Sequence, residues 1–161
     1  MKKYLVFFCI AIFVVLLDQV SKAFILSNLK LHESIDVING LFNIVHVRNS
    51  GAAFGMFADS SEAFRSIFFL GIGVLALSLI IYYIGQIKNG QTKLLVSLSL
   101  IFAGAIGNLI DRIRFGSVID FIDIYISTFH WPAFNVADSA ITVGAYLMLM
   151  EMFRRSKERG K

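Results

Sequence analysis

The chain has 161 residues, of which 57% are hydrophobic and 16% charged, and its mean hydropathy is +0.75. A composition this apolar excludes an ordinary soluble domain and indicates a single polytopic membrane domain over residues 1–161. The only cysteine, Cys9, excludes an intramolecular disulfide and a cysteine-based zinc site. The net charge of +4 does not indicate nucleic acid, because most basic residues flank apolar segments.

Four apolar segments predict transmembrane helices, at residues 4–26, 66–87, 94–110 and 138–153. Basic residues flank them at 2–3, 88–93 and 154–161, and the positive-inside rule places these flanks in the cytoplasm. The first segment also has features of a cleaved signal peptide, but no small-residue cleavage site follows its apolar core. We therefore predict an all-α membrane protein with four spans and both termini cytoplasmic.

The first span carries two charges near its outer end. Asp18 and Lys22 are one helical turn apart, so they can pair with each other. Such a pair either snorkels toward the interface or supports a nearby site, and the residues alone leave both interpretations open.

The first outer loop contains a predicted β-hairpin. Residues 34–38 and 41–47 are apolar-rich and are joined by Asn39-Gly40, a strong turn signal. Two strands are not stable alone, so we expect this small sheet element to rest on the membrane surface or to cap the helices. The following stretch, residues 48–55, is rich in small residues and is suited either to close approach by a bound peptide or to re-entering the interface.

A polar cluster interrupts the apolar chain between residues 104 and 138. Charged groups near hydrocarbon are costly, so such a cluster indicates function or mutual pairing. Its members are Asn108, Asp111, Arg112, Arg114, Asp120, Asp123, Asn135 and Asp138. If the third helix continues to Arg112, Asn108 and Arg112 share a face. Aromatic residues in the 115–132 connection are typical of the membrane interface.

Two close aspartates at a wet membrane edge can hydrolyse an amide. One carboxylate takes a proton from water while the other, protonated, donates to the carbonyl oxygen. Like charges cannot comfortably coexist, so the pair shares one proton. Four aspartates are candidates, of which Asp120 and Asp138 are favoured, because Asp120 follows an apolar approach and Asp138 starts a helix beside Asn135.

Other chemistries fit the sequence less well. A serine hydrolase would need a G-x-S-x-G elbow and a metalloprotease an H-E-x-x-H helix; neither occurs, and the three histidines, His32, His46 and His130, are scattered. A transporter or a membrane-embedded binding protein remains an alternative. A transporter would need polar groups along its whole path, whereas these stop in the outer half.

Five motifs in this order resemble the bacterial lipoprotein signal peptidases (signal peptidase II). They are Asp18-Gln19 with Lys22, Arg48-Asn49-x-Gly51-Ala52-Ala53-Phe54, Gly107-Asn108-x-x-Asp111-Arg112, Val118-x-Asp120-Phe121, and Phe134-Asn135-x-Ala137-Asp138-Ser139. The resemblance covers nearly the whole chain.

The resemblance implies roles for individual residues. Asp120 and Asp138 match the family's catalytic dyad. The positions that match the substrate groove are Asn49, Asn108, Arg112 and Asn135. Asp18, Lys22 and Asp111 match supporting residues, although for Asp111 we expect a salt bridge to Arg112 or Arg114. Asp123 lies outside the motif and is expected to be an exposed interfacial carboxylate.

The resemblance also implies a substrate and a location. The substrate is a prolipoprotein whose cysteine carries a diacylglyceryl group, cut on the N-terminal side of that cysteine, with no metal or other cofactor. The cyclic peptide globomycin inhibits the family. The implied location is the bacterial cytoplasmic (inner) membrane, with the active site near the outer leaflet and membrane lipid around it.

Overall fold

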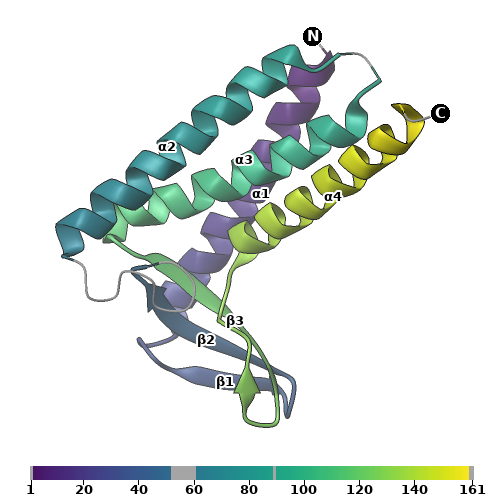
Figure 1. Cartoon of the computed structure of the whole chain (residues 1–161). Helices are drawn as coiled ribbons and strands as arrows, with labels where there is room; N and C mark the ends of the chain where they lie inside the picture. The colour runs from purple at the N-terminus through teal and green to yellow at the C-terminus, as the bar shows by residue number, and fades with distance from the viewer. Residues whose placement is uncertain (1, 52–60, 89, 160–161) are drawn as a thin grey trace.

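The computed structural model describes residues 2–51, 61–88 and 90–159. Within these residues the elements are, in chain order, α1 (Lys2–Asn28), β1 (Ser34–Ile38), β2 (Phe42–Asn49), α2 (Glu62–Gln86), α3 (Thr92–Phe115), β3 (Val118–Ile126), β4 (Phe129–His130) and α4 (Val136–Arg159). The helices form a bundle, and the sheet lies at one end of it (Figure 1). The first turn of α1 and the last turn of α4 lie at the opposite end.

In the described part of the chain, four helices are long and apolar enough to cross a membrane. Three of the predicted segments fall inside a helix, and the segment 66–87 runs one residue past α2. The third helix continues five residues beyond the predicted end at residue 110, because backbone hydrogen bonding does not require apolar side chains. It ends at Phe115 and is capped by Gly116, whose φ of 70° suits glycine and whose N–H donates to the Arg112 carbonyl.

Helix α3 is the centre of the bundle. It lies between α2 and α4 in Figure 1, with α1 behind it. One buried cluster joins α1, α2 and α3 around Phe7, Ile84 and Leu95. A second joins α1, α3 and α4 around Ala103 and Ala140, where small side chains bring the helices close.

The sheet is antiparallel throughout, in the order β1-β2-β3-β4. The predicted hairpin is confirmed as β1 and β2, and Gly40 in its turn has a φ of 83°. The sheet is larger than this hairpin, because β3 and β4, which come from the connection after α3, were not predicted as strands. The β-branched run of β3 pairs with β2 and places Val47 opposite Asp120.

The sheet caps one end of the bundle. Ile25 and Leu29 at the end of α1 pack against Ile119 and Phe121 of β3, and all four side chains are buried. The sheet that contains the predicted hairpin therefore caps the helices through β3, which lies directly beside the end of α1. In the stretch 48–55, which is rich in small residues, residues 52–55 lie outside the described part of the chain.

Candidate active site

The start of α4 holds Asp138 in a fixed orientation. Asp138 is the third residue of the helix, and its backbone N–H donates to Asn135 Oδ1 at 2.9 Å. In return, the Asn135 N–H donates to Asp138 Oδ2 at 3.3 Å. This reciprocal pair is a capping box. It satisfies two backbone donors at the helix start and anchors the carboxylate there, while the neighbouring Ala137 N–H donates to Asp18 Oδ1 at 2.9 Å.

Asp120 comes from β3 and is only 2% exposed. Its carboxylate accepts hydrogen bonds from Asn135 Nδ2 at 2.7 Å and from Asn49 Nδ2 at 3.1 Å. Asn135 therefore contacts both Asp120 and Asp138 from one fully buried position. These are the two aspartates favoured from the sequence, and the fold brings them to the same asparagine.

Asn108 of α3 is the second amide at this cluster. Its Nδ2 donates to Asp138 Oδ1 at 2.8 Å, and its Oδ1 accepts from Lys22 Nζ at 3.1 Å. Because a lysine ammonium can only donate, the Asn108 oxygen must face Lys22 and its NH₂ group must face Asp138.

Lys22 lies at the centre of a buried ion-pair network. Its Nζ is 2.9 Å from Asp18 Oδ2 and 2.8 Å from Asp111 Oδ2, and all three side chains are at most 2% exposed. The predicted pairing of Asp18 with Lys22 is confirmed, but at a buried site and not by snorkelling. The expected salt bridge from Asp111 to Arg112 or Arg114 is not what the structure shows, because α1 packs on α3 and presents Lys22 to Asp111.

Two neighbours of this network, Gln19 and Gly107, occur in the sequence motifs but were given no role in the site there. Gln19 Nε2 donates to Asp111 Oδ1 and lies 3.1 Å from Asp18 Oδ2. Gly107 allows the close approach of the two helices, since a Cβ there would lie 2.5 Å from Asp18 Oδ2. The available signal for Gln19 was a polar side chain beside Asp18 within an apolar span.

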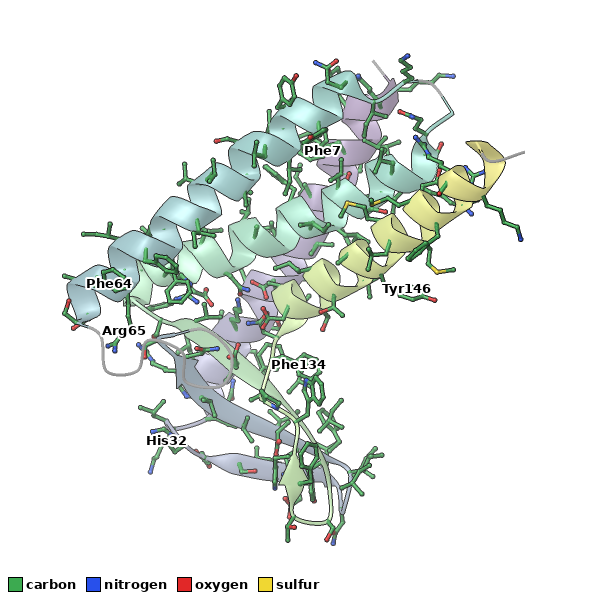
Figure 2. All side chains as sticks on the ribbon, in the orientation of Figure 1. Phe7, His32, Phe64, Arg65, Phe134 and Tyr146 are labelled. Carbon is green, nitrogen blue, oxygen red and sulfur yellow. The ribbon has the colours of Figure 1, made fainter. Side chains whose placement is uncertain are left out.

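Arg112 lies beside a groove that opens next to Asp138. Its Nη2 donates to the Gly51 carbonyl at 3.2 Å, and its guanidinium stacks 4.3 Å from the centre of the Phe69 ring. The groove has a volume of about 600 Å³, and Asn49, Arg112, Asp138 and Phe134 are among its lining residues. Phe134 is labelled in Figure 2, where the chain passes from the sheet to α4.

Asp123 of β3 is buried, at 7% exposure. It accepts from Asn43 Nδ2 at 3.0 Å and lies 2.9 Å from His130 Nδ1. The expectation of an exposed interfacial carboxylate was wrong because the register of β2 against β3 sets Asn43 directly opposite Asp123. Its partners differ from those of Asp120 and Asp138.

The electrostatic surroundings give Asp120 an unusual proton affinity. Burial, followed by the nearby charge of Asp138, raises the pKa of Asp120 to about 7, although hydrogen bonds from Asn49 and Asn135 act in the opposite direction. A carboxyl group that titrates near neutral pH can serve as an acid or a base. Among residues 2–51, 61–88 and 90–159, no three His, Cys, Asp or Glu side chains are grouped to hold a metal ion.

Comparisons with known proteins agree on one family. Residues 10–154 match the family model described as signal peptidase (SPase) II. The lipoprotein signal peptidase of Syntrophus aciditrophicus (strain SB) is 47% identical over 99% of both chains. That of Geobacter sulfurreducens is 46% identical over 97% of this chain and 96% of its own.

A solved structure gives the same result for the fold. It is described as a bacterial membrane enzyme at 2.3 Å resolution, is 37% identical and superimposes with a TM-score of 0.84 over 95% of this chain and 90% of that one. The chain therefore belongs to the signal peptidase II family, the multi-pass bacterial membrane aspartic peptidases that remove signal peptides from prolipoproteins.

Proposed function

We propose that Asp120 and Asp138 are the catalytic pair of this peptidase and that they share one proton. The observation that carries the proposal is a pair of hydrogen bonds from one residue. The side-chain amide of Asn135 donates to Asp120, and its backbone N–H donates to Asp138. Two carboxylates held on one residue cannot both be charged without a large penalty. Because Asp120 is the more buried of the two and its pKa is about 7, we assign the proton to Asp120 at rest.

The reaction follows from this assignment. Asp138 takes a proton from a water molecule, and the water oxygen attacks the scissile carbonyl carbon while Asp120 donates its proton to the carbonyl oxygen. As the resulting diol collapses, Asp138 gives the proton it took from water to the amide nitrogen, Asp120 takes back a proton from a diol hydroxyl, and the C–N bond breaks. The products are a carboxylic acid on the signal peptide and an amine on the cysteine. Both aspartates end the cycle with one proton between them.

Four residues are assigned to the substrate groove, with two kinds of role. Asn49 and Arg112 line the groove beside Asp138, so they are placed to hold the peptide backbone. Asn108 and Asn135 are hydrogen-bonded to the carboxylates, so they orient the pair itself. Beneath them, Lys22, Asp18 and Asp111 support Asn108 and the start of α4. Neither a metal nor another cofactor enters this mechanism.

The substrate is a prolipoprotein with a diacylglyceryl-cysteine, cut on the N-terminal side of that cysteine. A signal peptide crosses the membrane as a helix, and the lipid on its cysteine would anchor the scissile bond at the level of the dyad. We place both termini in the cytoplasm, the dyad near the outer leaflet of the inner membrane, and no nucleic acid among the partners. Globomycin is expected to occupy the groove next to Asp138.

The decisive test is cleavage of a diacylglyceryl-modified prolipoprotein by the purified protein in detergent with EDTA present. Asp120→Asn and Asp138→Asn should each lower the rate by about 10²–10⁴-fold, the range for losing one acid or base. Asp36→Asn changes an exposed carboxylate on β1 and should leave the rate unchanged.

Three outcomes would contradict the proposal. A near wild-type rate for either dyad variant would make that aspartate structural. Equal cleavage of a substrate without the diacylglyceryl group would show that the enzyme does not recognise the lipid on the cysteine. No cleavage by the wild type would favour a transporter or a binding protein instead.

A further inference from the structure

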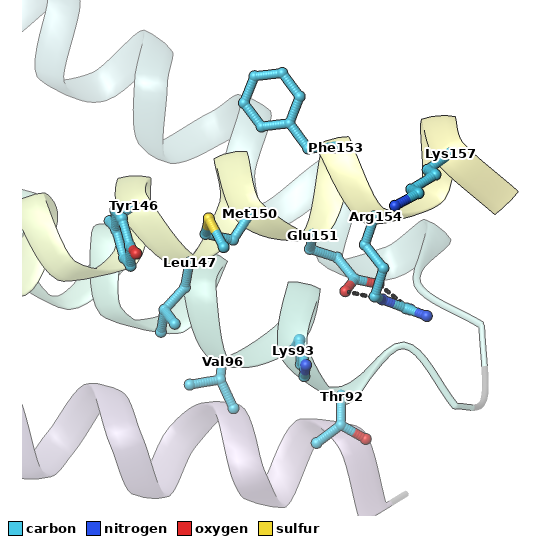
Figure 3. Close-up of a pocket in the computed structure, with 10 residues that line it drawn as sticks. All are labelled: Thr92, Lys93, Val96, Tyr146, Leu147, Met150, Glu151, Phe153, Arg154 and Lys157. Atoms are coloured by element: carbon cyan, nitrogen blue, oxygen red, sulfur yellow. Dashed lines mark hydrogen bonds and ion pairs between the residues drawn. The ribbon is translucent and has the colours of Figure 1, made fainter.

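A second groove lies at the end of the bundle that carries both termini, far along α4 from Asp138. It has a volume of about 660 Å³ and is formed by the start of α3 and the C-terminal half of α4 (Figure 3). Its body is apolar, with Val96, Leu147 and Met150 on its walls. Neither the catalytic assignment nor the substrate groove uses these residues.

The charges of this groove are gathered at one end. Lys93 comes from the first turn of α3, and Arg154 and Lys157 come from the last turns of α4. Figure 3 shows Arg154 and Lys157 toward the C-terminal end of α4, and Tyr146 toward the other end. Among the described residues that line the groove, three cations and one carboxylate, that of Glu151, give a net charge of +2.

Glu151 holds one of these cations in place. Its carboxylate is 4% exposed and accepts from Arg154 Nε at 2.9 Å, Arg154 Nη2 at 2.8 Å and Arg155 Nε at 2.8 Å. The Arg154 side chain nevertheless remains 50% exposed, so it can meet a ligand on its outer side. Because Glu151 is shared by two arginines, the rim stays positive.

The length of the groove matches one leaflet of a bilayer. Tyr146 and Lys157 are eleven residues apart, which is about 16 Å along a helix. Half of a hydrocarbon core is roughly 15 Å. An apolar body of this length with a basic end has the polarity of an anionic lipid, and basic pockets between transmembrane helices bind such headgroups.

We propose that this groove binds one anionic phospholipid, with its phosphate at Lys93, Arg154 and Lys157 and an acyl chain along Val96, Leu147 and Met150. A signal peptide is the other elongated apolar ligand available to this enzyme. Its N-terminal region is positively charged, so the basic rim repels it. Charge therefore favours the lipid.

The test is native mass spectrometry of the protein released from nanodiscs that contain phosphatidylglycerol and phosphatidylcholine in equal amounts. The wild type should retain phosphatidylglycerol selectively. The double variant Lys93→Gln with Lys157→Gln should lower its affinity for this lipid by about 30-fold. Each lysine near a lipid surface contributes about a fivefold gain in affinity, and the two factors multiply. The matched control, Lys2→Gln with Lys88→Gln, removes the same charge from the same end of the bundle outside the groove and should retain the lipid.

Further variants identify the occupant. Val96→Trp keeps the charges and fills the apolar part, so it should also reduce retention. Phosphatidylglycerol with a photoreactive acyl chain should cross-link to the α4 peptide that contains Leu147 and Met150. Equal loss of lipid in both double variants, equal retention of phosphatidylcholine, or cross-linking of Met150 by a photoreactive signal peptide in place of the lipid would overturn the proposal.

Discussion

Asn135 performs three tasks at once. Its side-chain oxygen caps α4, its side-chain NH₂ group donates to Asp120, and its backbone N–H donates to Asp138. An asparagine suits this position because its amide provides both a donor and an acceptor, which neither an aspartate nor a leucine would. The start of a helix and the alignment of two carboxylates therefore depend on the same buried side chain.

The raised pKa of Asp120 predicts the alkaline limit of activity. Its pKa is about 7 and its ordinary value is near 4, so the shared proton is lost as pH rises through about 7, and cleavage should decline there. The Asn49 amide stabilises the charged carboxylate, so Asn49→Ala should raise this pKa and move the decline to higher pH. A pH profile of the cleavage rate measures this shift, and Asn28→Ala, at an exposed position at the end of α1, is the control. A move to lower pH would contradict the assignment.

The buried lysine predicts a large effect on stability. Lys22→Met leaves the Asp18 and Asp111 carboxylates buried without their cation, which should cost about 3–5 kcal/mol. Thermal unfolding in detergent measures the loss, and Lys30→Met, at an exposed position, should have little effect. Adding Asp18→Asn and Asp111→Asn to the lysine variant should recover part of the stability, because the uncompensated charges are gone. The absence of any recovery would argue against a charge effect.

At the level of elements, the site depends on how closely α3 and α4 pack. Gly104 faces the Ala137 carbonyl, and Gly144 of α4 faces the backbone of α3, so the two helices meet through backbone contacts. This contact brings Asn108 within 2.8 Å of Asp138. The hydrogen bond that orients the second carboxylate is thus a consequence of two small residues in the helix interface.

Adding one methyl group should separate these helices. A Cβ at Gly104 would overlap the Ala137 carbonyl oxygen, so Gly104→Ala should cost about 1–3 kcal/mol by overpacking and should also reduce cleavage by displacing Asp138 from Asn108. Gly71 has open space around its Cβ position, and Gly71→Ala is the matched control in α2. Thermal unfolding and cleavage rates test both variants. Equal behaviour of the two would show that the contact can relax.

At the scale of the whole molecule, the two ends of the bundle differ in their polar groups. The sheet and the polar cluster occupy one end of the bundle, and the basic residues of the first turn of α1 and the last turns of α4 that the structure describes occupy the other (Figure 1). The helix α2 is tied to the second end by Lys3, whose Nζ donates to the Gly85 and Ile87 carbonyls at 2.9 and 3.1 Å. This polarity is the basis for the proposed orientation in the membrane.

Cysteine labelling tests that orientation. In a Cys9→Ala background, a single cysteine is placed in the sheet by Asp36→Cys or near the end of α4 by Ser156→Cys, both at exposed positions. A membrane-impermeant maleimide applied to spheroplasts should label the sheet position at once and the α4 position only after permeabilisation. The reverse pattern would invert the topology and place the dyad near the inner leaflet.

The amino-acid sequence by itself determined the apolar helices, the β-hairpin and the set of polar residues from which the site is drawn. Each of these can be recognised within a short stretch of sequence. An apolar run is long enough for a bilayer, and an Asn-Gly pair predicts a turn. Amides and carboxylates are costly within an apolar protein, so their presence indicates a function. The same local reasoning failed for Asp111 and Asp123, whose partners lie on other elements.

Only the tertiary structure decided which of four aspartates share Asn135, and that β3 joins the hairpin. These contacts join distant parts of the chain: Lys22 and Asn108 are 86 residues apart, and Asp18 and Ala137 are 119 apart. Strand register and helix packing set such contacts through the summed burial of many side chains. No short window of sequence contains that sum, so the partners of a carboxylate emerge only when the whole bundle and the sheet are assembled.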